Sequence, residues 1–275
     1  MQATRIGINA MTVVKVPVTE HLSLIKGAGF DAFFNYFDYN TEQWANEAAK
    51  KGLLFTSIHA PSSREQHIWN GVEKGEAEMK KLFDCLADCK RFDVPVMVLH
   101  TINGFDATTP KAPTQVGLDA YARLVDEACR LGVTLAFENT EREEFLAAVM
   151  EKFKDAPCLG FCYDSGHEHC YQNSDMLSLY GDKLCHTHLD DNFGKTGDHI
   201  TWYDDAHLPP LDGTVNWKRV MQALDRIGYN GVLSLELTMK DKPERHTHGA
   251  YAATTPADYY ALAATRARRL LSGDF

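Results

Sequence analysis

Short runs of apolar, β-branched and aromatic residues recur along the whole chain, and the intervals between them are long enough for a helix. The runs are almost continuously apolar, which is typical of parallel strands that are buried on both faces. This pattern predicts eight strands, at residues 5–9, 31–35, 53–59, 96–100, 133–138, 159–164, 184–189 and 232–237.

Segments with apolar residues at helical spacing separate these runs. They predict helices at residues 20–28, 41–51, 75–92, 114–131, 141–153, 174–180, 216–227 and 257–271. Glycines stand where several of these helices give way to the next strand, as at Gly52 and Gly132. Eight strand–helix pairs without a break in composition predict one α/β domain over residues 1–275, a (β/α)8 barrel. Residues 190–214 form the longest irregular stretch, and a loop of that length usually carries function.

Composition agrees with this fold and narrows the expected partners. The chain has 275 residues, close to the roughly 250 of such a barrel, and 44% of them are hydrophobic, so a large core can form. The formal net charge of −10 opposes binding to nucleic-acid phosphate or anionic lipid. We therefore expect neither nucleic acid nor a membrane as a partner, whereas a homo-oligomer is compatible with the sequence.

The start of the chain and the cysteines indicate the compartment. Residues 1–9 do not resemble a signal peptide, and no apolar run approaches the roughly 20 residues that cross a bilayer. The seven cysteines are odd in number and include no CxxC pair, which suggests neither a disulfide framework nor a zinc ribbon. We expect reduced thiols and a cytoplasmic location.

Polar residues that can bind metals end six consecutive predicted strands. The carboxyl ends of the strands of a (β/α)8 barrel converge on one pocket, although the residues are remote in sequence. Imidazoles mixed with carboxylates suit Zn²⁺, Mn²⁺ or Fe²⁺ better than Ca²⁺. The residues concerned are His59, His100, Glu138, Asp164, His188 and Glu236.

Any one of these residues alone is more often a hydrogen-bonded group at the barrel rim than a ligand. Six in register are different, because burying Glu138, Asp164 and Glu236 near one another would be costly without a cation between them. The sequence therefore predicts a divalent-metal site. It contains no Gly-rich phosphate loop and no dinucleotide fingerprint, so no organic cofactor is expected.

The segments around these residues resemble the xylose isomerase-like TIM barrel superfamily, which contains sugar and sugar-phosphate isomerases and epimerases and also endonuclease IV. The resemblance covers nearly the whole chain; each motif is weak alone, and their order and spacing make the set specific. The motifs are His59-Ala60-Pro61, Val98-Leu99-His100, Phe137-Glu138-Asn139-Thr140, Tyr163-Asp164-Ser165-Gly166-His167, His188-Leu189-Asp190-Asp191-Asn192, residues 205–213 and Leu235-Glu236.

This resemblance implies that Glu138, Asp164, His188 and Glu236 hold a divalent ion such as Mn²⁺, Zn²⁺, Co²⁺ or Mg²⁺. In the epimerase branch the two glutamates also exchange protons with the substrate, and the residue matching His167 helps to bind it. The resemblance thus makes Glu138, Glu236 and His167 the expected catalytic residues.

In the endonuclease IV branch, two further groups of ligands hold additional zinc ions. His59 and His100 join Glu138 in one group, and the other consists of His167, Asp205 and His207. All of these positions are filled in this chain. The resemblance therefore implies one, two or three metal ions.

Further side chains near the strand ends are candidates for contact with a substrate. We expect His59, His100, Trp69 and Lys195 to bind it, although ordinary loop packing is an equal alternative for the tryptophan. The other aromatic candidates for the pocket wall are Phe105, Phe193, Trp202 and Tyr203. A substrate phosphate could be held by Lys15, Arg64, Lys111, Lys195 or Lys240, and each of these could equally be a solvated surface charge.

The favoured activity is that of a metal-dependent sugar or sugar-phosphate isomerase or epimerase, of the ketose 3-epimerase or aldose–ketose isomerase type. The metal would polarise the carbonyl, one of Glu138 and Glu236 would remove the adjacent proton to give a metal-held enediolate, and the other would return a proton. One alternative is endonuclease IV-like cleavage of abasic DNA, which the negative charge and the acidic or mixed loops after His59 and Glu138 oppose. The others are a related metal-dependent dehydratase and a non-catalytic barrel that binds metal or sugar.

Overall fold

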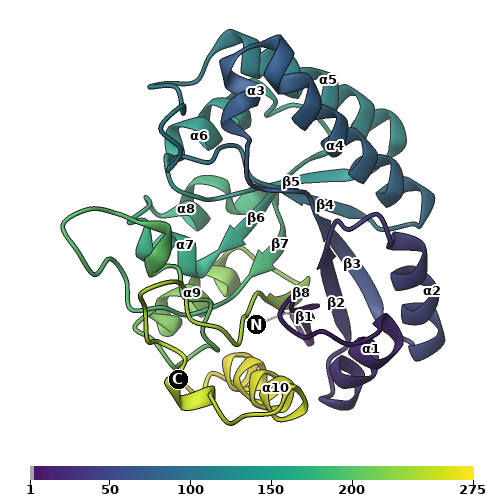
Figure 1. The fold of residues 1–275 in the computed structure, drawn as a ribbon, viewed down its shortest axis with the longest axis vertical. Helices are drawn as coiled ribbons and strands as arrows, with labels where there is room; N and C mark the ends of the chain where they lie inside the picture. Colours follow the sequence, from purple (N-terminus) through teal and green to yellow (C-terminus); the bar gives the residue numbers. More distant parts are fainter. Residues whose placement is uncertain (1–2) are drawn as a thin grey trace.

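The computed structural model describes residues 3–275, in which eight parallel strands form one nearly closed barrel surrounded by helices (Figure 1). The strands run in the order β7-β6-β5-β4-β3-β2-β1-β8. Their bounds are β1 Arg5–Asn9, β2 Ala32–Tyr36, β3 Leu54–His59, β4 Val96–Leu99, β5 Thr134–Glu138, β6 Leu159–Asp164, β7 Leu184–His188 and β8 Val232–Leu235. The predicted barrel and all eight strands are confirmed.

The two ends of the sheet meet between β7 and β8. There the strands are joined by a single parallel bridge between Leu189 and Leu235, in place of a full ladder. The Leu189 N–H donates to the Ser234 carbonyl at 2.9 Å, and the Ser234 N–H donates to the Thr187 hydroxyl at 3.0 Å. These contacts bring the carboxyl ends of all eight strands around one opening.

Helices follow the strands and cover the outside of the barrel (Figure 1). Gly52 and Gly132 end α2 and α5 in the left-handed conformation, with φ of 61° and 73°, as expected from the sequence. The helices are α1 Val18–Gly27, α2 Thr41–Lys51, α3 Gln66–Asn70, α4 Val72–Arg91, α5 Gln115–Leu131, α6 Glu143–Lys152, α7 Ser165–Cys170, α8 Met176–Tyr180, α9 Trp217–Arg226 and α10 Pro256–Ser272. The short helices α3 and α7 were not predicted, because five or six residues are too few to establish a helical period.

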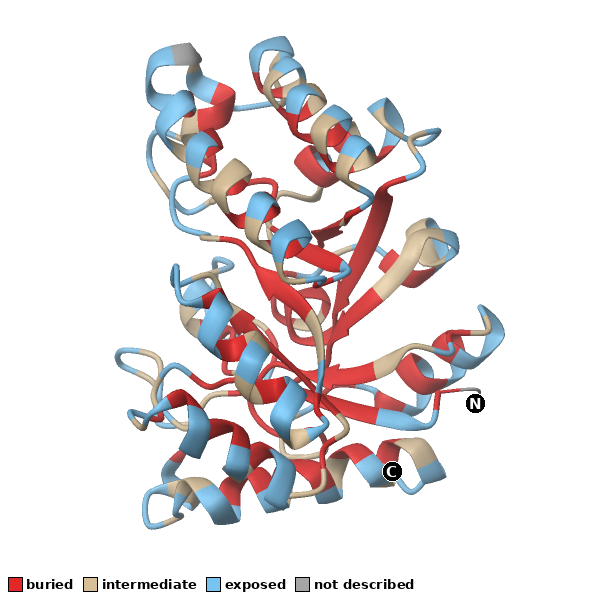
Figure 2. Cartoon of the chain, turned by 90° about the vertical axis from the view of Figure 1, so that its right-hand side faces the viewer, coloured by how far each residue is buried: buried red, intermediate tan, exposed pale blue. Residues whose placement is uncertain are grey.

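Burial follows the alternation of side chains along the strands. The strands are almost entirely buried, and the helices expose their outer faces (Figure 2). One set of strand residues packs outward against the helices in the main apolar core, while Val96, Val98, Ala136 and Cys162 form a separate small cluster.

The cysteines depart from the sequence-based expectation. A disulfide joins Cys129, near the end of α5, to Cys158, which precedes β6, across a Cα–Cα distance of 5.0 Å. The prediction of reduced thiols was wrong for this pair, because residues 29 apart in sequence are brought together only by the tertiary fold. Cys85, Cys89 and Cys162 are free and buried. Within residues 3–275, no helix combines the length and the apolar composition needed to cross a membrane.

Candidate metal centre

The candidate ligands form one layer at the carboxyl end of the barrel. Side chains alternate across a strand, so a residue two positions after an inward-facing residue also faces inward, one layer higher. Each candidate ligand lies two positions after such a residue. The pairs are Ser57 and His59, Val98 and His100, Ala136 and Glu138, Cys162 and Asp164, His186 and His188, and Ser234 and Glu236. Below this layer, His186 is buried and lies 3.1 Å from the Ser57 hydroxyl.

Four of these residues form the central group of the layer. Ligand atoms of Glu138, Asp164, His188 and Glu236 all lie within 4.8 Å of one another, and all four side chains are buried. Nδ1 of His188 is 3.1 Å from an oxygen of Glu138 and 3.1 Å from an oxygen of Glu236. The His188 ring stacks on Phe34 of β2, with 4.6 Å between centroids. The four residues that the sequence placed at a central site are thus brought together.

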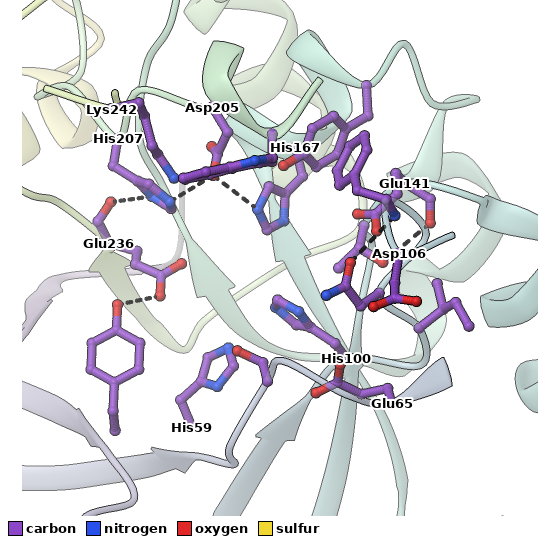
Figure 3. A pocket seen from close by; sticks show the side chains of 18 residues that line it. His59, Glu65, His100, Asp106, Glu141, His167, Asp205, His207, Glu236 and Lys242 are labelled. Carbon is purple, nitrogen blue, oxygen red and sulfur yellow. Dashed lines mark hydrogen bonds and ion pairs between the residues drawn. The ribbon is translucent and has the colours of Figure 1, made fainter. Parts of the chain in front are cut away.

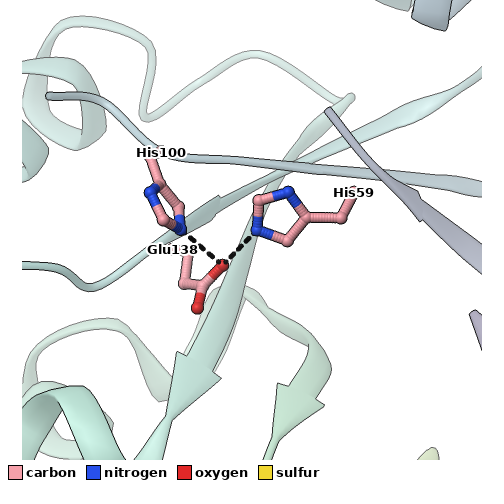
Figure 4. Close-up of side chains that lie close together, drawn as sticks. All are labelled: His59, His100 and Glu138. Atoms are coloured by element: carbon pink, nitrogen blue, oxygen red, sulfur yellow. Dashed lines mark ion pairs between the residues drawn. The ribbon is translucent and has the colours of Figure 1, made fainter. Parts of the chain in front are cut away.

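A second group adds two histidines to one carboxylate. Nε2 of His59 and Nε2 of His100 lie 3.3 Å and 3.4 Å from Oε2 of Glu138 (Figure 4). Nδ1 of His59 is 2.7 Å from the Ala60 carbonyl, which can only accept, so this nitrogen carries the proton. The lone pair of Nε2 then faces a carboxylate oxygen, an arrangement that a shared cation or proton stabilises.

The third group lies beside the centre. Ligand atoms of His167, Asp205 and His207 lie within 4.8 Å of one another. Both histidines direct Nδ1 toward a backbone carbonyl: His167 to Asn139 at 2.9 Å and His207 to Glu236 at 3.1 Å. Their Nε2 atoms approach Oδ2 of Asp205, at 3.5 Å for His167 and 2.8 Å for His207. The same orientation as in His59 therefore recurs, and the three groups named by the sequence analysis are all assembled.

The unpaired polar atoms of the layer fit a divalent cation. Within residues 3–275, the buried atoms without a hydrogen-bond partner include Oε2 of Glu138, Oδ2 of Asp164, Nε2 of His188 and both carboxylate oxygens of Asp190. Buried carboxylates without donors are unfavourable unless a cation binds them. A mixture of imidazole nitrogen and carboxylate oxygen suits Zn²⁺ or Mn²⁺.

The pKa values reflect the same crowding of charge. Burial, with Glu138 and Glu236 close by, raises the pKa of Asp164 to about 7. Burial alone would also raise the pKa of Glu138, but the imidazoles of His188 and His100 more than offset it and hold that pKa well below its ordinary value. Asp164 thus resists ionising beside the two glutamates, and a divalent cation bound among the three carboxylates would favour its ionised form.

A pocket of about 500 Å³ opens above the ligand layer (Figure 3). Glu236, His167 and His207 line it, whereas Glu138 is fully buried and lies outside the lining. Tyr36 also reaches the pocket, and its hydroxyl donates to Oε1 of Glu236 at 2.6 Å. Of the two glutamates expected to move protons, Glu236 is therefore the one with direct access to a bound molecule.

Several predicted contacts lie in this lining, and others do not. His59, His100, Phe105 and Trp202 line the pocket. Trp69 lies outside the lining: it is 1% exposed, packs against Tyr121 and Phe145 and donates from Nε1 to the Thr101 carbonyl at 2.7 Å. Trp69 belongs to the unpredicted helix α3, which turns its ring into the core.

The predicted basic contacts are also absent from the lining. Lys195 and Phe193 border a different cavity, beside His169 and Arg219, and lie outside the lining of this pocket. Lys15 and Lys240 border another cavity, and Arg64 and Lys111 are exposed. The pocket lysine is instead Lys242, whose Nζ lies 3.3 Å from Oδ2 of Asp205.

Sequence analysis missed Lys242, Tyr36, Glu65 and Glu141 as pocket residues. Tyr36 ends β2 as the candidate ligands end their strands, so the position of a polar group at a strand end could have identified it. Lys242, Glu65 and Glu141 lie beyond the strand ends, where the direction of a loop decides what a side chain faces.

The loop after β7 carries Asp205 and His207 to the pocket. The carboxylate of Asp191 stabilises this loop. It accepts hydrogen bonds from the N–H groups of Leu211 at 3.0 Å and Val215 at 2.9 Å and from Nε1 of Trp217 at 2.7 Å. His207 has φ of 51°, a conformation that side chains other than glycine rarely adopt. The irregular stretch predicted at residues 190–214 thus contributes two of the candidate ligands.

Solved structures with similar folds include several sugar-converting enzymes. The chain is 19% identical to a D-tagatose 3-epimerase-like protein, with a TM-score of 0.71 and 98% and 97% of the two chains covered. It is 17% identical to the 3-keto-D-glucoside 4-epimerase YcjR of E. coli, with a TM-score of 0.72 and 96% and 99% covered. The IolI protein, solved with a bound zinc atom, is 19% identical, with a TM-score of 0.75 and 99% of both chains covered. Similarity at this level of identity establishes the fold.

Two curated relatives are similar in sequence. An uncharacterised protein of Methanocaldococcus jannaschii, MJ1311, is 23% identical over 256 residues, with 84% of this chain and 83% of the relative covered. An uncharacterised protein of Sinorhizobium fredii, y4fM, is 30% identical over 124 residues, 44% of this chain, and the match spans only 37% of that protein.

The barrel, its candidate ligands at the strand ends and these structural relatives agree with a match to a protein family. The model of the xylose isomerase-like TIM barrel family matches residues 22–256, which is most of the chain. The chain belongs to the xylose isomerase-like TIM barrel family.

Proposed function

We propose that this protein is a divalent-metal-dependent sugar isomerase or epimerase that moves a proton at a carbon next to a carbonyl. Its similarity to sugar epimerases supports an enzyme of this general kind. The observation that carries the proposal is the approach of two carboxylates, from β5 and β8, to the same nitrogen of His188 at 3.1 Å each. They reach one point from different sides of the barrel mouth.

Glu138, Asp164, His188 and Glu236 would hold the metal ion. When bound, a divalent ion would polarise a substrate carbonyl and acidify the adjacent C–H group. His59, His100 and His167, which line the pocket, would orient the substrate above this layer.

Glu236 would take or return the proton on the side of the pocket that it lines. Tyr36 fixes the orientation of this carboxylate through the 2.6 Å hydrogen bond to Oε1. On the other side, Glu138 would act together with His167, whose Nδ1 lies 3.3 Å from Oε1 of Glu138 and whose ring faces the pocket. General acid–base catalysis needs groups at hydrogen-bonding distance from the reacting atoms, and this arrangement supplies one on each side.

A panel of aldoses, ketoses and their phosphates tests the proposal. The protein would be stripped with a chelator, reloaded with Mn²⁺, Co²⁺, Zn²⁺ or Mg²⁺, and assayed by NMR in D₂O. We expect metal-dependent conversion of at least one sugar, with solvent deuterium at the product carbon. Sugar binding without conversion by any metal-loaded form would contradict the proposal and favour a non-catalytic barrel.

A second candidate is metal-dependent phosphodiester cleavage at abasic DNA. The additional groups His59–His100–Glu138 and His167–Asp205–His207 favour it, because they provide ligands for further ions. The net charge of −10 and the carboxylates of the pocket wall oppose it. We expect the zinc-loaded protein to show negligible incision of an abasic duplex at physiological salt. Efficient metal-dependent incision would reverse the order of the two candidates.

A further inference from the structure

The pocket has two chemically different ends. Glu236, Asp205 and His207 mark the end above the metal ligands, and Glu65, Asp106 and Glu141 line the opposite end (Figure 3). The latter three come from the loops that follow β3, β4 and β5. We call these three carboxylates the distal acidic wall.

The protein itself leaves acceptor capacity unused in this wall. Glu65 is 4% exposed, and its Oε2 atom is buried without a hydrogen-bond partner among the described residues. The Gly104 N–H donates to Oε1 of Glu141, and the Thr108 N–H donates to Oδ1 of Asp106 at 2.7 Å. Within residues 3–275, none of the three carboxylates pairs with a lysine or arginine side chain. Backbone N–H groups thus hold Glu141 and Asp106, and Oε2 of Glu65 is left free to accept from a bound molecule.

The positive charge of the pocket lies at its other end. Lys242 is 18% exposed, lies over the Trp202 ring at 5.2 Å and pairs with Asp205. The remaining basic residues that the sequence offered for a phosphate lie outside the pocket, as described above. Within the described residues, a phosphate at the distal wall would meet three carboxylates and no lysine or arginine side chain.

These surroundings discriminate between charged and neutral ligands. A phosphate dianion close to carboxylates in a partly buried pocket is strongly disfavoured, whereas hydroxyl groups donate well to such oxygens. Burial raises the pKa of Glu65 to about 7 and also raises the pKa of Glu141. The hydrogen bonds from Thr108 instead lower the pKa of Asp106, so this carboxylate stays ionised near neutral pH and the wall keeps a negative charge that disfavours a phosphate.

We infer that the distal acidic wall selects a non-phosphorylated, polyhydroxylated substrate, whose hydroxyl groups remote from the metal donate hydrogen bonds to Glu65, Asp106 and Glu141. The assignment of the reacting end rests on the proposed function. The selection of an uncharged ligand rests on the pocket wall alone. Binding measurements therefore test the selection, and turnover measurements test the proposed function.

The test compares matched sugars, D-fructose with D-fructose 6-phosphate and D-tagatose with D-tagatose 6-phosphate, by calorimetry and turnover on Mn²⁺-loaded protein. We expect at least one free ketose to bind tenfold or more tightly than its phosphate. Glu65→Gln removes a charged acceptor and should weaken binding of the free ketose by about tenfold at unchanged metal content. Glu141→Lys should shift the preference toward the phosphate by a similar factor. Glu73→Gln, on the exposed face of α4, is the matched control and should change neither value.

Equal or tighter binding of the phosphates by the unmutated protein would overturn the inference, as would failure of every free ketose to bind. Because Glu65 is buried, its variant is interpreted only with a native circular dichroism spectrum. Glu141→Lys is an independent test. If the folded variant keeps the same preference for the free ketose over its phosphate, the inference is also overturned. Binding of a free ketose without turnover would instead contradict the proposed function and leave the selectivity of the wall intact.

Discussion

Asp164 has two roles at the candidate centre, as a candidate ligand and as a helix cap. It ends β6, lies within ligand distance of Glu138, His188 and Glu236, and caps α7 by accepting from the His167 N–H at 2.6 Å. Its other oxygen has no partner among the described residues. One carboxylate oxygen thus accepts from the backbone, and the other is free to bind a cation.

Asp164→Ala should therefore lose most of its bound divalent metal and keep its fold, although loss of the cap lowers stability by about 1 kcal/mol. Elemental analysis after gel filtration measures the metal, and circular dichroism checks the fold. Asp198→Ala, in an exposed loop, is the control. Full metal occupancy in a folded Asp164→Ala protein would remove this residue from the centre.

His21 is a buried titratable residue remote from the ligand layer. It lies against Trp44, and its Nε2 is 2.7 Å from the Tyr260 hydroxyl. Burial lowers its pKa from 6.5 to about 4. The unfolded chain therefore binds this proton more readily, so the stability contribution is present above pH 6.5 and is lost as the pH falls toward 4.

Between pH 7 and pH 5 this single group should lower the free energy of unfolding by about 2 kcal/mol. Urea unfolding of the metal-free protein at both pH values, compared with His21→Gln, isolates the effect. We expect the variant to be less stable at pH 7 and to lose about 2 kcal/mol less on acidification. The same pH dependence in both proteins would assign the acid sensitivity to other groups.

At the scale of elements, the loop after β7 is held by one buried carboxylate. Asp191 accepts four hydrogen bonds, from the N–H groups of Asn192, Leu211 and Val215 and from Nε1 of Trp217. These bonds fix the segment that brings Asp205 and His207 to the pocket. The loop is therefore an ordered part of the site although it has little regular secondary structure.

Asp191→Asn replaces one acceptor oxygen with an NH₂ group that faces backbone donors. We expect a loss of about 2–4 kcal/mol in the free energy of unfolding. We also expect faster amide exchange in residues 190–217, measured by mass spectrometry, while α1 and α2 keep their protection. Trp217→Phe removes only one of the four donors and should show a smaller effect in the same segment. Unchanged exchange in folded Asp191→Asn would show that the loop is held by other contacts.

The elements also show what could be predicted from the sequence. Strands buried on both faces leave long apolar runs, so the barrel and the candidate ligands at its strand ends could be predicted from the sequence. The burial of Trp69 was not predicted because α3 is too short to give a periodic signal, and the Cys129–Cys158 disulfide depends on tertiary packing. Glu65 and Lys242 were missed because they lie in loops whose direction no pattern of the chain specifies.

At the scale of the whole molecule, closure of the barrel brings β5 and β8 to one centre. The two strands are separated by about 100 residues in sequence, yet Glu138 and Glu236 meet at His188. The acidic net charge and the carboxylates of the pocket agree with a small neutral substrate rather than DNA. The central claim is that this closure creates a proton-transfer site.

The most direct measurement of that claim is the turnover of Glu236→Gln with the sugar that the unmutated protein converts. The amide keeps the size of the side chain and an oxygen for the metal, and removes the base. At retained metal occupancy and with substrate affinity within about threefold, we expect turnover to fall by about 10²–10⁴-fold, the range of general acid–base catalysis. Near-normal turnover by the metal-loaded variant would contradict the account, because the essential proton would then be carried by another group such as His167.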